Sequence, residues 1–199
     1  MRRFAITHDY LCPFARNAAE VVVRALESGA PFQPDFRAFS LSQVHLADGE
    51  PPVWQTGAEP RSGVQALQWG LAVRDELPER FPAVHLALFA ARHDQGRDLN
   101  DPEVLAAAVA SAGVDPDEVE KLVASGRPAA ALADDHTWAA DTARVFGVPT
   151  FVTAHRAVFV RLMDRPVTPE AAGSTLDRVL TMVEDWPDLN EFKATAIPR

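Results

Sequence analysis

Cysteine is almost absent from this sequence, and its scarcity excludes several kinds of site. The 199 residues contain a single cysteine, Cys12, so no disulfide can form within the chain. A zinc site built from cysteines or an iron–sulfur cluster needs several thiolates and is excluded for the same reason. Cys12 therefore acts alone or together with a sulfur atom from another molecule.

Positive charge and long apolar runs are also scarce. Lysine and arginine number 19 against 28 acidic residues, and this net charge of −9 predicts neither nucleic acid nor an anionic membrane as a partner. No apolar run approaches the roughly 20 residues of a membrane span. Met1-Arg2-Arg3-Phe4 is not followed by the apolar stretch of a signal peptide, so we expect a cytoplasmic protein. The spacing of the histidines indicates no metal site.

Hydrophobic patterning predicts a strand–helix–strand unit at the start of the chain. The expected strand covers residues 3–8, the helix residues 13–28 and the second extended segment residues 32–41. Such a unit is typical of two parallel strands joined by a right-handed crossover. The fold class is therefore α/β.

The rest of the chain predicts a helical insertion followed by a return to the sheet. Residues 64–133 show repeated helix-capping signals without a strand pattern, and strands are expected at 148–152 and 157–162 before a last helix that Thr168 opens. One α/β domain would then comprise residues 1–60 and 140–199, with residues 61–139 inserted as a helical domain.

Cys12 lies where the first strand gives way to the first helix. Unpaired backbone N–H groups and the helix dipole stabilise an anion at such a place, which predicts a lowered thiol pKa and a reactive thiolate. Pro13 suits the first helical turn because a proline has no N–H to leave unpaired. The alternative is that Cys12 is a small buried apolar residue without chemistry.

A second signal is the proline in Gly147-Val148-Pro149-Thr150-Phe151. Proline cannot donate to a strand ladder, so its place in an apolar strand needs an explanation. A cis Val148–Pro149 bond at the start of the strand would leave the backbone of Val148 free to pair with an extended substrate. A trans proline at the first residue of an edge strand is the alternative.

Together these residues resemble a known family. Cys12-Pro13-Phe14-Ala15, Gly147-Val148-Pro149-Thr150 and the helical insertion are similar to the DsbA-like thioredoxin-fold family, which includes FrnE-like proteins, 2-hydroxychromene-2-carboxylate isomerases and kappa-class glutathione transferases. The resemblance covers residues 3–185 and implies a thioredoxin-like fold with a helical insertion of the DsbA type. It implies that Cys12 is catalytic and that six residues contact the substrate: Pro13, Phe14, Ala15, Val148, Pro149 and Thr150.

The sequence also departs from that family. Dithiol members carry a second cysteine where this chain has Ala15, so no internal thiol can resolve a mixed disulfide. The resemblance then implies no tightly bound cofactor but a low-molecular-weight thiol such as glutathione or mycothiol, or a protein thiol or disulfide, as partner; homodimers occur among the relatives. Arg161 and Met163 lie near the end of the last strand and predict that the edge of the Cys12 site differs in shape from that of the related oxidoreductases.

Three further residues are candidates for auxiliary roles. His8 ends the first strand and His136 precedes the proline loop by about three helical turns, so either could serve as a base beside the sulfur. Arg16, one turn into the first helix, could hold an anionic substrate near Cys12. The alternatives are hydrogen-bonded structural histidines and a surface arginine.

Two other groups carry weaker signals. Asp134 and Asp135 beside a histidine could form a carboxylate–histidine relay, but they also fit a solvated acidic helix face, which we favour. Trp54, Trp69 and Trp138 could line a pocket between the insertion and the sheet, although large aromatic residues are most often part of a core.

The sequence leaves three functions open. The first is a thiol–disulfide oxidoreductase that uses Cys12 alone. The second is an isomerase or transferase in which a small thiol cofactor attacks and Cys12 positions it. The third is a redox-inert binding protein that retains the cleft.

Overall fold

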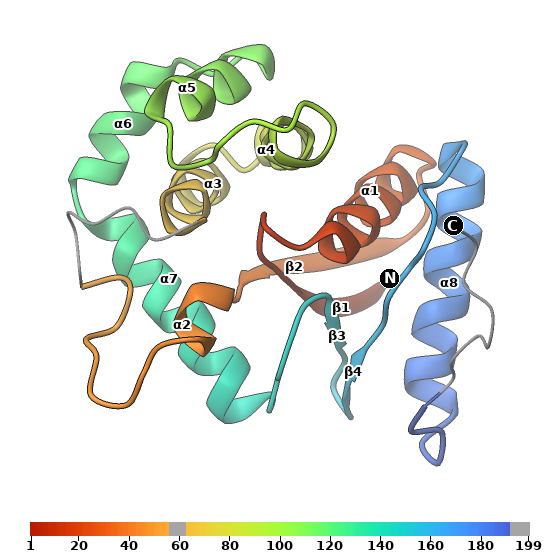
Figure 1. The fold of residues 1–199 in the computed structure, drawn as a ribbon. Coiled ribbons are helices and arrows are strands. Elements are labelled where there is room, and N and C mark those ends of the chain that lie inside the picture. Colours follow the sequence, from red (N-terminus) through yellow and green to blue (C-terminus); the bar gives the residue numbers. More distant parts are fainter. Residues whose placement is uncertain (56–62, 192–199) are drawn as a thin grey trace.

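The computed structural model describes residues 1–55 and 63–191 and contains one four-stranded sheet (Figure 1). The strands lie in the order β2-β1-β3-β4. Strand β1 pairs in parallel with β2 and antiparallel with β3, which pairs antiparallel with β4. The bounds are β1 (Arg2–His8), β2 (Phe32–Ala38), β3 (Thr150–Val152) and β4 (Ala157–Phe159). The α/β class and the parallel pairing of β1 with β2 agree with the sequence-based prediction.

Strand β1 is central, and its sequence explains why. Residues Phe4 to His8 are all buried, as expected for a strand with neighbours on both edges and helices packed against its faces. Helix α1 (Pro13–Glu27) follows, with Pro13 in its first turn, and packs against α8 (Pro169–Asp185). In Figure 1 these two helices, red and blue, lie beside one another. The first and last segments of the chain therefore build one layer.

The helices between β2 and β3, shown mostly in yellow and green in Figure 1, include those of the predicted insertion and also a short helix at residues 41–44 that the sequence did not predict. Asp101 and Asp115 cap two of them by accepting hydrogen bonds from the backbone N–H groups of Glu103 and Asp117. No helix in the described ranges is long and apolar enough to cross a membrane. The segment comprises α2 (Leu41–Val44), α3 (Val64–Glu76), α4 (Phe81–His93), α5 (Pro102–Ser111), α6 (Pro116–Ala124), α7 (Arg127–Thr137) and the π-helix η1 (Trp138–Thr142).

Neither of the two expected domain boundaries falls between two described elements. The boundary between residues 60 and 61 lies outside the described residues. The boundary between residues 139 and 140 falls inside η1, which continues directly from α7. The division into two domains stays a prediction.

A buried carboxylate ties the insertion to the sheet. Asp135 on α7 is 2% exposed and accepts the backbone N–H of Ala38 at 2.9 Å. Its carboxylate also pairs with Arg37 from β2 at 3.0 Å and with Arg74 from α3 at 2.5 Å. The expectation of a solvated acidic face is therefore wrong for Asp135 and right for Asp134, which is exposed. Helical spacing alone did not show which neighbour faces the arginines.

Two histidines and a tyrosine fill the space beside these ion pairs. The rings of His8 on β1 and His85 on α4 lie 4.6 Å apart, and the Tyr10 hydroxyl is 2.9 Å from Nδ1 of His85. All three side chains are buried. We call the buried contact formed by His8, His85, Asp135, Arg37 and Arg74 the polar seam.

Candidate functional site

Cys12 is the residue that caps helix α1. Its backbone is extended, with φ −92° and ψ 117°, and Pro13 begins the helix immediately after it. The Cys12 N–H donates to the Asp9 carbonyl at 3.0 Å, which closes a tight turn between β1 and α1. The thiol is thereby held at the helix N-terminus, as the sequence predicted.

The proline loop brings Val148 to the same place. The Cys12 thiol donates to the Val148 carbonyl over a distance of 3.3 Å, although the two residues are 136 positions apart. The Val148–Pro149 bond is cis, in agreement with the expectation from the sequence. The Val148 carbonyl was expected to be free for a substrate, and here the Cys12 thiol occupies it.

Two of the six expected substrate contacts have internal roles instead. The N–H of Thr150 donates to the Thr7 hydroxyl at 3.0 Å, and the Thr150 hydroxyl donates to the Gly147 carbonyl at 2.7 Å. Thr150 therefore shapes the loop. Ala15 is 1% exposed and faces the core, so it offers no surface to a ligand. Pro13 is exposed and Phe14 half-buried.

The structure overturns the prediction of a lowered thiol pKa. Burial raises the pKa of Cys12 above its ordinary value, and the neighbouring carboxyl of Asp9 acts in the same direction. The N–H groups of Ala15 and Phe14 and the charge of Arg161 oppose this rise without outweighing it. The hydrogen bond to Val148 also favours the protonated form, because only a thiol can donate it. Cys12 is thus a neutral thiol at neutral pH.

Asp9 is a site residue that the sequence reasoning did not single out. Its two carboxylate oxygens accept the N–H groups of Leu11 at 2.9 Å and Leu41 at 2.7 Å. Burial raises the pKa of Asp9 to about 6, against the effect of these two bonds. The available signal was its position three residues before Cys12, in the turn that leads to α1. Asp9 joins the turn of Cys12 to the start of α2.

The surface around Cys12 carries three phenylalanines and one arginine. The guanidinium carbon of Arg161 lies 5.3 Å from the ring centroid of Phe14 and 5.6 Å from that of Phe159. Phe146 is 76% exposed, and its ring centroid is 5.4 Å from that of Phe159. We call Phe14, Phe146, Phe159 and Arg161 the cysteine rim. The sequence singled out Arg161 here, but not Phe146.

His8 does not serve as a base for Cys12. It is 3% exposed, and burial together with the charge of Arg74 lowers its pKa to about 3. Its ring contacts are with Tyr10 and His85, on the inside of the fold. His8 belongs to the polar seam, and the alternative of a structural histidine is the correct one.

His136 has a structural role as well. Its Nδ1 accepts the N–H of Ser40 at 3.1 Å, and its ring stacks on Phe39 with centroids 4.6 Å apart. Burial lowers its pKa to about 4, so the ring is neutral at neutral pH. The ring joins α7 to the segment after β2.

Arg16 is neither a substrate ligand nor a surface arginine. It is 7% exposed and pairs with Asp94 at the end of α4, with Glu20 at 4.0 Å. Arg165 pairs with Glu20 in turn and lies 3.6 Å from Asp94. These four charges fasten α1 to the insertion and to the segment before α8. The sequence could not show this, because Asp94 and Arg165 are distant from α1 in the chain.

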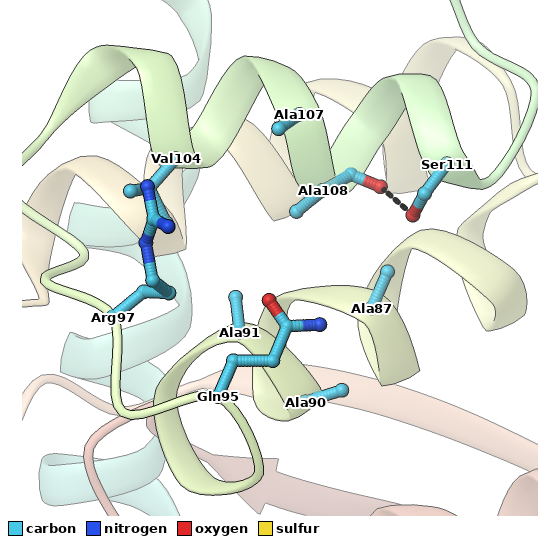
Figure 2. Close-up of a pocket in the computed structure, with 9 residues that line it drawn as sticks. All are labelled: Ala87, Ala90, Ala91, Gln95, Arg97, Val104, Ala107, Ala108 and Ser111. Carbon is cyan, nitrogen blue, oxygen red and sulfur yellow. Dashed lines mark hydrogen bonds between the residues drawn. The ribbon is translucent and has the colours of Figure 1, made fainter.

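The tryptophans and the observed hollows lie apart from Cys12. Trp69 is buried in the core, Trp54 packs on His136 with centroids 5.5 Å apart, and Trp138 lies under Arg37. A hollow of about 230 Å³ lies between α4 and α5. Figure 2 shows alanines on both of its walls. Its lining comprises Ala87, Ala90, Ala91, Gln95, Arg97, Val104, Ala107, Ala108 and Ser111. None of these lining residues is a cysteine, a histidine or a carboxylate, so the hollow supplies neither a thiol nor a base for one.

Comparisons with solved structures find the same fold in bacterial oxidoreductases. The cytosolic disulfide reductase DsbM from Pseudomonas aeruginosa, solved with GSH, shares 17% identity at a TM-score of 0.63, over 89% of this chain and 98% of that chain. The oxidoreductase DsbA from Xylella fastidiosa shares 16% identity at a TM-score of 0.59, over 92% and 86%. A thioredoxin-like oxidoreductase from Silicibacter pomeroyi DSS-3 shares 17% at 0.58, over 90% and 86%. At such identities the likeness establishes the fold alone.

A search of curated proteins finds no match. Residues 6–165 match the family described as the DSBA-like thioredoxin domain. This segment contains Cys12, the helical insertion and the cis-proline loop, so it includes every part of the site described above. The chain therefore belongs to the DSBA-like thioredoxin domain family.

Proposed function

We propose that the protein is a thiol–disulfide oxidoreductase that works through Cys12 alone. The observation that carries this proposal is the contact between the Cys12 thiol and the carbonyl beside Pro149, at the N-terminus of α1, in a chain of the DSBA-like family. Backbone N–H groups at a helix N-terminus stabilise the negative charge that develops on the sulfur of a nucleophile there.

The reaction consists of two exchanges. Cys12 loses its proton, attacks one sulfur of a disulfide and forms a mixed disulfide, while the substrate S–S bond breaks and the leaving thiolate takes a proton. A second thiol then attacks the mixed disulfide, forms a new disulfide and returns Cys12 to its reduced state. Each step breaks one S–S bond and forms another, so the substrate disulfide and the second thiol are the only redox partners that the cycle needs.

The second thiol has to come from outside the chain. The residue one helical turn after Cys12 is Ala15, and no other cysteine exists. A low-molecular-weight thiol such as glutathione or mycothiol fits this requirement. The solved DsbM is described as cytosolic and was solved with GSH, which supports a small thiol partner and a cytoplasmic location for this chain as well. Self-association stays a prediction of the resemblance.

The raised pKa of Cys12 favours a second candidate function. A neutral thiol is a hydrogen-bond donor, as the contact with Val148 illustrates. In a small-thiol-dependent isomerase or transferase, Cys12 would donate that bond to the sulfur of the bound thiol, which itself attacks the substrate. Cys12 would then position a nucleophile rather than act as one.

Replacing Cys12 with serine separates the two functions. The experiment has two measurements. The first is the intact mass of the protein after incubation with small disulfides, and the second is the turnover rate of the reaction in which glutathione is the co-substrate. Exchange through Cys12 predicts an adduct of one small thiol on the wild-type protein, and loss of both adduct and turnover in Cys12→Ser. Retained turnover in Cys12→Ser would support the isomerase or transferase. A wild-type protein without adduct or turnover would contradict both and favour a redox-inert binding protein.

A further inference from the structure

We propose that Arg161 makes Cys12 selective for sulfur compounds that carry a carboxylate close to the reacting sulfur. The inference rests on the proposed function and names the class of its substrate. It concerns the cysteine rim, where the exposed Arg161 lies over two aromatic rings, one of which belongs to Phe14, two residues after Cys12.

The position of Arg161 is set by the rings on either side of it. Its guanidinium lies over Phe14 from α1 and over Phe159 from β4, at 5.3 Å and 5.6 Å from the ring centroids. Such contacts attract a cation to the face of an aromatic ring and restrict a long side chain that would otherwise sample many rotamers. Because Phe14 is two residues after Cys12, the charge is held near the sulfur.

The charge of Arg161 is available to a ligand. Within residues 1–55 and 63–191, no carboxylate pairs with it, whereas Arg16 and Arg165 are paired with Asp94 and Glu20. The charge of Arg161 also favours the thiolate of Cys12, against the larger effect of burial, which raises the pKa of that thiol. The negative group near Cys12, Asp9, is buried and bound by two backbone N–H groups. The positive charge of Arg161 is therefore exposed to a ligand, whereas the carboxyl of Asp9 is not.

The charge of Arg161 is opposite in sign to the net charge of the molecule. The chain carries a net charge of −9, so an anion approaching most other surfaces is repelled. An arginine fork donates two parallel hydrogen bonds to a carboxylate, and the exposed ring of Phe146 and the half-buried ring of Phe159 offer apolar contact beside it. The ligand class that fits is a small thiol or disulfide with a carboxylate at one end.

Alkylation with two reagents of equal chemistry and different charge tests this proposal. Iodoacetate is anionic and iodoacetamide is neutral, and both react with the Cys12 thiolate, so the ratio of their rates cancels any change in the thiol pKa. The variants are Arg161→Gln, which removes the charge, Arg161→Lys, which keeps it, and Arg178→Gln. Arg178 is exposed on α8 and makes the matched control for net charge.

We expect the ratio of iodoacetate to iodoacetamide rates to fall about threefold in Arg161→Gln, the effect of one charge acting across roughly 7 Å of water. Arg161→Lys and Arg178→Gln should stay close to wild type, and about 1 M salt should reduce the wild-type ratio. An unchanged ratio in Arg161→Gln, or an equal fall in Arg178→Gln, would overturn the proposal.

A second measurement separates this inference from the proposed function. Adduct formation on Cys12 is compared for three small disulfides, the anionic dithiodipropionate, the neutral hydroxyethyl disulfide and the cationic cystamine. We expect the order anionic, neutral, cationic in wild type and a reduced spread in Arg161→Gln. If none forms an adduct while the alkylation ratio still depends on Arg161, the exchange function fails and the charge selection stands. Equal adduct formation by all three would overturn the selection alone.

Discussion

The cysteine rim and the polar seam both carry charge, yet they use it in opposite ways. In the seam, Asp135 is buried, accepts a backbone N–H and pairs with two arginines. Its charge therefore stabilises the contact of α3 and α7 with β2. In the rim, Arg161 is exposed, lies over two rings and forms no ion pair with a carboxylate among the described residues. The acids and histidines that suggest catalysis in the sequence are therefore structural. Near Cys12, the charge that a ligand can reach is that of the exposed Arg161.

The largest expected effect is on the seam. Replacing Asp135 with asparagine should lower the free energy of unfolding by about 3 kcal/mol, because two arginines would lose their buried counter-charge. The adjacent variant Asp134→Asn is the control, since that side chain is exposed and should shift stability by less than about 0.5 kcal/mol. Urea unfolding at neutral pH measures both. Equal effects of the two variants would remove the distinction between seam and surface.

The pH dependence of stability tests the histidines of the seam. The pKa of His8 is about 3 in the folded protein and 6.5 in an unfolded chain, so below pH 6.5 the unfolded state binds a proton that the folded state does not. The free energy of unfolding should therefore fall as the pH falls from about 6.5 toward 3, by about 1.4 kcal/mol per pH unit for this group. His85, whose pKa burial lowers as well, adds to the fall.

Asp9 has the opposite sign. Its pKa is about 6 when folded and 3.8 when unfolded, so the folded state binds the extra proton and gains stability as the pH falls between these values. The test compares urea unfolding at several pH values for wild type, His8→Leu and the exposed His155→Gln. His8→Leu should flatten the acid slope, and His155→Gln should not change it. A slope unaffected by His8→Leu would show that His8 titrates normally.

Much of the fold was predictable because its signals are local. Pro13, Asp101, Asp115 and Thr168 mark helix starts at the ends where the structure has them. The parallel pairing of β1 with β2 followed from the strand–helix–strand order at the start of the chain, whereas the antiparallel pairing of β1 with β3 needed the tertiary structure. The π-helix at residues 138–142 was not predicted, since nothing in the local pattern distinguishes it from a continuing α-helix.

The site was predictable only in part. Cys12 and the proline loop were identified from their chain positions, and the structure places the thiol 3.3 Å from the Val148 carbonyl. The thiol pKa was predicted in the wrong direction, because a helix N-terminus is visible in a sequence while the extent of burial is not. The roles of His8 and Arg16 depend on partners far along the chain and needed the tertiary structure.

The central claim is that Cys12 is a neutral thiol held beside Pro149, whose reactivity is limited by burial and guided by the rim. The rate of Cys12 alkylation by iodoacetamide, followed from about pH 6 to pH 11, tests it most directly. The rate should rise with an apparent pKa above the ordinary value of about 8.5, because burial and the bond to Val148 both favour the protonated sulfur. A rate already at its plateau at pH 7 would reveal a stabilised thiolate and contradict the account.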